Sequence, residues 1–216
     1  MSAPKSTPIT QYTITRGVFR SSYDITTTGQ HGQPLYHVDN SHWTPGKPDL
    51  TFHTGANTTG PIAGVSKYRH FSSDTEIGLG DPSQPHAIEW FRLSRDSIMS
   101  GRYSIRITLG ITTTGSNSVN NNQQQQQPRT FTWKRTRALS RHSGGLKLVD
   151  ESDRVVAVFG SGGSFSTSGQ MDIYVQYGER FQLLVLVSGL ALREKLARAR
   201  KAAAAGAGAG GGGGGA

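Results

Sequence analysis

The chain has 216 residues, with 23 Lys and Arg against 14 Asp and Glu, and it contains no Cys. This length predicts one domain with a single hydrophobic core, because globular domains centre on roughly 100 to 200 residues. The absence of Cys excludes disulfide scaffolds, thiolate zinc sites, iron–sulfur clusters and Cys nucleophiles. The formal net charge of +9 favours anionic partners, such as lipid headgroups, nucleic acid or acidic proteins, without choosing among them.

The N-terminal segment, residues 1–11, is expected to be flexible. No apolar run follows Lys5, so this segment does not have the pattern of a secretory signal. We therefore expect a cytoplasmic protein, with the membrane periphery and the nucleus as alternative locations.

Short strands with period-two alternation dominate the next 170 residues. The clearest case has apolar residues at every odd position from Tyr103 to Ile111, as expected for a strand with one face on the core. Phe131 and Trp133 alternate in the same way with polar neighbours. The remaining strands are expected at residues 12–19, 24–28, 35–38, 50–53, 63–68, 76–79, 88–93, 146–149, 155–159 and 171–177. About a dozen short strands separated by Gly, Pro, Asn and Ser predict an all-β sandwich or barrel rather than βαβ units.

Two segments have compositions that do not predict a packed core. Residues 112–128 are polar and rich in Asn and Gln, and they are expected to form a low-complexity loop inside the domain. Residues 202–216 contain only Ala and Gly and are expected to be a disordered tail. The domain is therefore expected to span residues 12–201.

The apolar stretch Phe181–Leu192 predicts a buried helix. Its twelve residues are too few to cross a bilayer, and their apolar side chains cover every face of a helical wheel. A helix of roughly 18 Å that is apolar all round must be enclosed all round, and a closed barrel of about twelve strands has room for one. We therefore predict a mainly β fold, a closed antiparallel barrel around a central C-terminal helix. A final strand over residues 181–187 is the alternative, because Gly189 is a poor helix former.

This pattern resembles the tubby C-terminal-like superfamily, which includes LURP-one-related proteins and phospholipid scramblases. Three strings carry the resemblance: FTWKRT at 131–136, LKLVDESDRVVAVF at 146–159 and FQLLVLVSGLALREK from Phe181, which together look like small, single-domain fungal-type members. The resemblance spans roughly residues 12–201. It implies a twelve-stranded barrel around a central helix and, for tubby proper, phosphoinositide headgroups bound on a basic surface. The Cys-rich palmitoylated stretch of scramblases is absent, since the chain has no Cys.

Basic residues near the last helix and after Trp133 are the candidate lipid-binding residues. The helix carries most of them, at Arg193, Lys195, Arg198, Arg200 and Lys201, and the others are Lys134, Arg135, Arg137 and Arg141. Each Lys or Arg near an anionic leaflet contributes about 1 kcal/mol, so this set predicts peripheral, salt-sensitive binding. The main alternative is a protein-binding scaffold or signalling module of the LURP-one-related type. Scramblase-like lipid transport and nucleic-acid binding are weaker alternatives.

No catalytic constellation is visible in the sequence. The nearest histidine cluster is His37, Asp39 and His42, and it lies in a turn-rich segment. No third ligand to join the two histidines can be identified there at a metal-binding spacing. The Gly-rich run 160–169 lacks the Gly-Lys-Ser/Thr of a phosphate loop. We therefore expect a protein that is not an enzyme and has no cofactor and no metal.

Overall fold

The computed structural model describes residues 7–17, 21–29, 32–41, 44, 46–69, 72–97, 100–109, 128–136, 145–161 and 169–208. The expected low-complexity loop falls outside these ranges, except for Pro128, which begins a strand.

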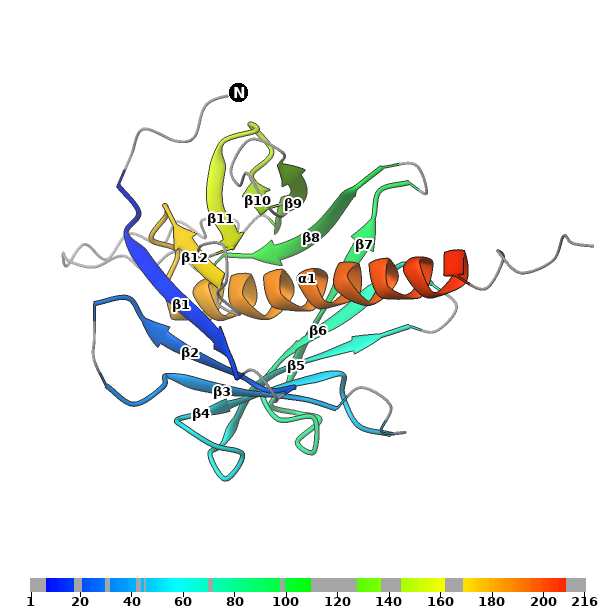
Figure 1. Cartoon of the computed structure of the whole chain (residues 1–216). Helices are drawn as coiled ribbons and strands as arrows, with labels where there is room; N and C mark the ends of the chain where they lie inside the picture. Colours follow the sequence, from blue (N-terminus) through cyan, green and yellow to red (C-terminus); the bar gives the residue numbers. More distant parts are fainter. Residues whose placement is uncertain are drawn as a thin grey trace, which may run out of the picture.

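Within these described ranges, twelve strands form one closed antiparallel barrel, with a single long helix running through it (Figure 1). The strands are β1 (Thr10–Arg16), β2 (Tyr23–Thr27), β3 (Tyr36–Asn40), β4 (Leu50–Thr54), β5 (Ile62–Tyr68), β6 (Thr75–Leu79), β7 (Glu89–Arg95), β8 (Arg102–Thr108), β9 (Pro128–Thr136), β10 (Gly145–Val149), β11 (Val155–Ser161) and β12 (Gly169–Ile173). Each strand pairs with its neighbours in sequence, and β1 closes the barrel against β12, from Thr10 opposite Ile173 to Ile14 opposite Gly169.

The alternation that predicted the strands also decides what faces the barrel interior. In β8, Tyr103, Ile105 and Ile107 are buried in the core, whereas Arg102 and Arg106 are exposed on the outside. Every strand expected from the sequence is present, with its bounds shifted by a few residues. The predicted fold class is therefore confirmed.

The helix α1 (Glu179–Gly208) fills the barrel. Four consecutive residues, Leu184 to Val187, are each at most 1% exposed, and because consecutive helical side chains point about 100° apart, the helix is enclosed on all sides. Trp133 of β9, completely buried, donates a hydrogen bond from Nε1 to Ser188 Oγ at 3.1 Å. The apolar segment is thus a helix and not a thirteenth strand.

The helix also continues beyond its expected end. Residues 202–208, which composition assigned to a disordered tail, form its last turns. Ala has the highest helix propensity, and adding residues to an existing helix avoids the cost of nucleation, so the Ala202–Ala205 run propagates what precedes it. Residues 209–216 lie outside the described part.

Gly189 lies where the helix backbone comes close to the barrel wall. A Cβ atom added there would lie 2.7 Å from Met171 Cε and 3.1 Å from the Trp133 ring. We expect Gly189→Ala to lower the free energy of unfolding by about 1 kcal/mol, because overpacking costs about 1–3 kcal/mol and exceeds the gain in helix propensity. Urea unfolding measures the change.

The matched control is Gly206→Ala in the same helix, where no atom lies within 4 Å of the added Cβ. This variant should be unchanged or slightly more stable, since only helix propensity changes. Equal stabilisation by both substitutions would contradict the close approach at Gly189.

The up-and-down order of the strands gives the barrel two distinct rims. The last residues of β1, β3, β5, β7, β9 and β11 and the first residues of the strands that follow them all lie at one end, because successive strands are antiparallel. β12 runs away from this end, so α1 begins at the opposite rim and returns through the barrel. We call the end where the helix emerges the exit rim. The final turns of the helix project beyond the strands there (Figure 1).

Candidate anion-binding rim

Arg198 fixes the emerging helix to the exit rim. Its Nη1 forms an ion pair with Asp49 Oδ1 at 2.8 Å, and its Nη2 donates to Asn40 Oδ1 at 2.8 Å. The guanidinium also lies over the Tyr68 ring, 4.8 Å from its centroid. Burial raises the pKa of the Tyr68 hydroxyl, although the charge of Arg198 opposes this, so the phenol stays neutral and donates to Ala191 O at 2.8 Å.

Glu194 is a buried carboxylate on the same part of the helix, only 6% exposed. Tyr23 donates a short hydrogen bond to its Oε1, and Asn40 Nδ2 donates to its Oε2 at 3.1 Å. Arg16 Nη1 lies 3.9 Å from Oε1. Three side chains from β1, β2 and β3 therefore compensate the charge that the helix carries into the barrel.

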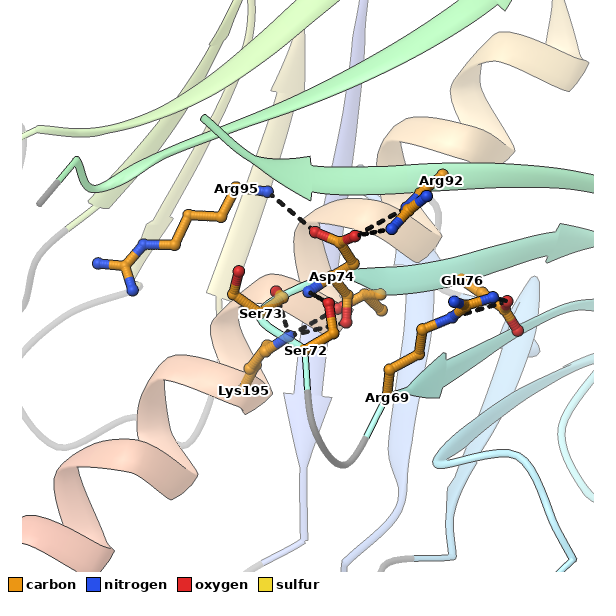
Figure 2. Close-up of polar contacts among 9 residues, drawn as sticks. Arg69, Ser72, Ser73, Asp74, Glu76, Arg92, Arg95 and Lys195 are labelled. Carbon is orange, nitrogen blue, oxygen red and sulfur yellow. Dashed lines mark hydrogen bonds and ion pairs between the residues drawn. The ribbon is translucent and has the colours of Figure 1, made fainter. Parts of the chain in front are cut away.

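Lys195 anchors the helix to the β5–β6 turn (Figure 2). Its ammonium donates to Ser73 O, to Asp74 O at 3.0 Å and to Thr75 Oγ1 at 3.2 Å. These three acceptors use all three of its N–H groups. Burial lowers the pKa of Lys195, with the nearby Asp74 and Asp49 charges acting against that effect.

The Asp74 carboxylate, beside this anchor, is held from β7 (Figure 2). Arg92 Nε donates to Oδ2 at 2.7 Å, and the backbone amide of Arg95 donates to Oδ1 at 3.4 Å. Burial alone would raise the pKa of Asp74, but the hydrogen bonds and charge of Arg92 hold it below its usual value. Arg69 and Glu76 form a separate ion pair on the outer surface.

Arg193 is the fourth anchor, with its guanidinium 5.0 Å from the centroid of the Phe159 ring. Burial lowers its pKa, with Tyr23 and Glu194 opposing the shift. The five basic residues predicted on the helix are thus divided by depth. Arg193, Lys195 and Arg198 bind the barrel, whereas Arg200 and Lys201 are exposed on the projecting turns.

A second group of cations lies on the outer face of the barrel toward the exit rim. Lys134 of β9 stands directly opposite Arg102 of β8 and directly opposite Lys147 of β10. The Lys134 ammonium forms an ion pair with Asp153. This hydrogen bond and the Lys134 charge lower the pKa of Asp153, with smaller contributions from Lys147 and Arg102.

Arg135 is exposed at the end of β9, and its Cδ lies 3.6 Å from the position of a Cβ on Gly101. It therefore sits at the exit rim beside the start of β8, on the other side of the strand from Lys134, as the alternation predicted. Of the predicted residues, Arg137 and Arg141 fall outside the described ranges.

Arg102 joins this group although the sequence analysis did not select it. Its place in the period-two pattern of β8 was the available signal, since Tyr103 faces inward. Within the described part of the chain, Arg102, Arg135, Arg200 and Lys201 form no ion pair. The exit rim therefore combines anchored cations inside its mouth with exposed cations around it.

Among the residues that the structure describes, no group of three or more His, Cys, Asp or Glu is placed to hold a metal ion. No helix in the described ranges is long and apolar enough to cross a membrane.

Comparison with protein-family models, with curated proteins and with solved structures finds no match to this chain. The resemblance to the tubby-like superfamily therefore stays a prediction, and the chemistry of the exit rim is what supports a function.

Proposed function

We propose that the protein is a non-enzymatic, tubby-like binding module whose exit rim binds anionic membrane surfaces peripherally, with phosphoinositide headgroups as the preferred ligand. The observation that carries this proposal is the row Arg102, Lys134 and Lys147, three cations in directly opposed positions on neighbouring strands. Like charges opposite each other destabilise a sheet. Asp153 pairs with Lys134, and an anionic surface would supply counter-charge to Arg102, which forms no ion pair within the described residues.

The exposed cations around the rim support the same proposal. Arg135 lies beside the start of β8, and Arg200 and Lys201 project from the mouth on the last turns of the helix. At about 1 kcal/mol for each cation near an anionic leaflet, Arg102, Arg135, Arg200 and Lys201 would together contribute about 4 kcal/mol. That energy gives reversible association, which added salt weakens.

We expect the double variant Arg102→Gln/Arg135→Gln to bind phosphoinositide vesicles about tenfold or more weakly than the wild type, because it removes two rim charges. Cosedimentation with neutral, phosphatidylserine and phosphoinositide vesicles, at low and near-physiological salt, measures the change. Deleting residues 200–216 should give a similar loss, since it removes Arg200 and Lys201 and keeps the anchors up to Arg198.

The matched control is Arg106→Gln/Arg129→Gln, which removes two exposed cations from the same two strands nearer the opposite rim. Its binding should stay close to that of the wild type. Equal losses in both double variants would contradict a site at the exit rim. Equally tight binding to phosphatidylserine and phosphoinositide vesicles of the same charge would contradict a preference for the phosphoinositide headgroup.

A protein-binding module is the second candidate, and Trp90 favours it. This side chain is 42% exposed on the outer face of β7, and a Cβ atom added at Gly78 would lie 3.0 Å from its ring and 2.9 Å from the completely buried Val65. Lys67 Nζ lies 5.1 Å from the centroid of the Trp90 ring. Partly exposed Trp is enriched at the energetic centres of protein interfaces. No binding to any vesicle would reject the membrane proposal and favour this one.

A further inference from the structure

Three titratable side chains form a row on the outer face of β2, β3 and β4, far in sequence from the basic residues of the exit rim. Asp24 stands opposite His37, and His37 stands opposite His53. The inward-facing neighbours Val38 and Phe52 are completely buried, so both histidines point outward. Directly opposed residues in an antiparallel pair have Cβ atoms about 4.5–5.5 Å apart, so the two imidazoles start from adjacent positions on one face.

The hydrogen bonds of the two rings define the tautomer of each neutral imidazole. His53 Nδ1 lies 3.0 Å from Gly60 O, and a carbonyl oxygen only accepts, so this nitrogen carries the proton. His37 Nδ1 lies 2.7 Å from Asp24 Oδ1, and an ionised carboxylate likewise only accepts. In each neutral ring Nε2 is then the atom with the lone pair. The His37 side chain is only 14% exposed, so its ring is held in place.

We propose that His37 and His53 bind one transition-metal ion, such as Cu²⁺, Ni²⁺ or Zn²⁺, through their Nε2 atoms. Neutral imidazole is a preferred ligand of these three ions. Metal-binding histidines characteristically donate their other ring N–H to a carboxylate or a backbone carbonyl, which fixes the ring and strengthens the ligand. Asp24 and Gly60 supply these two acceptors.

Two protein ligands leave the remaining coordination positions to water or to a small anion. Affinity should therefore be lower than at structural zinc sites, which have four protein ligands. It should follow the general order for divalent ions, with Cu²⁺ bound more tightly than Ni²⁺ or Zn²⁺. The sequence spacing gave no sign of this pair, because the partner of His37 lies on the next strand and not in the cluster with His42.

The test is isothermal titration calorimetry of the full, untagged chain with Cu²⁺, Ni²⁺ and Zn²⁺ chlorides, which measures the affinity and the number of ions bound. We expect wild-type protein to bind one ion at this site and His37→Ala and His53→Ala each to lose at least about tenfold in affinity. Asp24→Asn should lose about tenfold, as expected for a group that orients a ligand. Circular dichroism and metal-free thermal unfolding check that each variant keeps the fold.

The control is His86→Ala, which removes an exposed histidine outside the row and should leave the affinity unchanged. The histidines outside the described ranges stay in every variant, so any ion that they bind is unaffected by these substitutions. An affinity unchanged in both His37→Ala and His53→Ala would overturn the proposal. So would wild-type protein that binds none of the three ions, or an equal loss in His86→Ala.

Discussion

Glu194→Ala should lower the free energy of unfolding by about 3 kcal/mol, because the substitution breaks a buried polar network. The carboxylate accepts from Tyr23 and from Asn40, and Arg16 lies nearby. Without it, the buried Tyr23 hydroxyl and the half-buried Asn40 amide lose their acceptor. Burial and the Glu194 charge both raise the pKa of Tyr23, so this phenol is neutral and remains a donor at physiological pH.

Guanidinium chloride unfolding of Glu194→Ala measures this loss, with Glu179→Ala as the matched control. Glu179 lies in the first turn of the same helix and is exposed, so its removal should cost less than about 1 kcal/mol. Glu194→Gln should fall between the wild type and Glu194→Ala, since an amide oxygen still accepts one hydrogen bond. Equal unfolding midpoints for Glu194→Ala and Glu179→Ala would show that the network contributes nothing.

Because this network anchors the helix, the residue at which a C-terminal deletion begins decides whether the deletion also destabilises the fold. A deletion that begins at Arg193 would remove structural contacts together with the exposed cations. Arg193, Glu194, Lys195 and Arg198 tie the helix to β11, to β2 and β3, to the β5–β6 turn and to Asp49. A deletion that begins at Arg200 is therefore the one expected to separate membrane binding from stability.

The fold could be predicted because its two signals are local. Alternation with period two is visible within a single strand such as β8, and an apolar run that covers every face of a helix demands enclosure. Once a dozen strands and one such helix are identified, a closed barrel is the arrangement that buries both. The sequence did not predict the helical end beyond Lys201, because a segment of only Ala and Gly has the composition of a disordered tail. Ala is nevertheless the best helix former, whereas Gly is among the worst.

The division of the basic run at the exit rim could not be predicted in the same way. Whether Arg198 lies inside the mouth and Arg200 outside depends on the height of the barrel and on how far the helix is threaded through it. Both depend on strand tilt and register around the whole barrel, which no local pattern encodes. The same holds for His37 and His53, which are neighbours only because of the β3–β4 register.

Trp133→Ala is expected to lower the free energy of unfolding by about 4 kcal/mol, the largest effect we foresee. The indole is completely buried between β9 and the helix, and truncating a buried Trp costs about 3–5 kcal/mol because a cavity remains. For a chain of this length, each kcal/mol shifts the melting temperature by roughly 2–4 °C, so a drop on the order of 10 °C should follow.

The matched comparison is Trp90→Ala, the same substitution at a residue that is 42% exposed on the outer face. It should cost about 1 kcal/mol, because less apolar surface leaves contact with the protein. Differential scanning calorimetry of both variants measures their melting temperatures. The comparison separates the effect of burial inside the barrel from the effect of removing a large side chain. Similar melting temperatures for the two variants would contradict the position of Trp133 inside the barrel.

The hydrogen bond from Trp133 to Ser188 can be separated from this packing by a double-mutant cycle. Trp133→Phe keeps an aromatic ring but leaves the Ser188 hydroxyl with only its 3.4 Å contact to Val185 O, whereas Ser188→Ala leaves the buried indole N–H without its acceptor. Each single substitution should cost more than the bond itself, because the partner stays buried and unsatisfied. The double variant should therefore be about 1 kcal/mol more stable than the sum of the single losses predicts. Additive losses would mean that this bond does not link β9 to the helix.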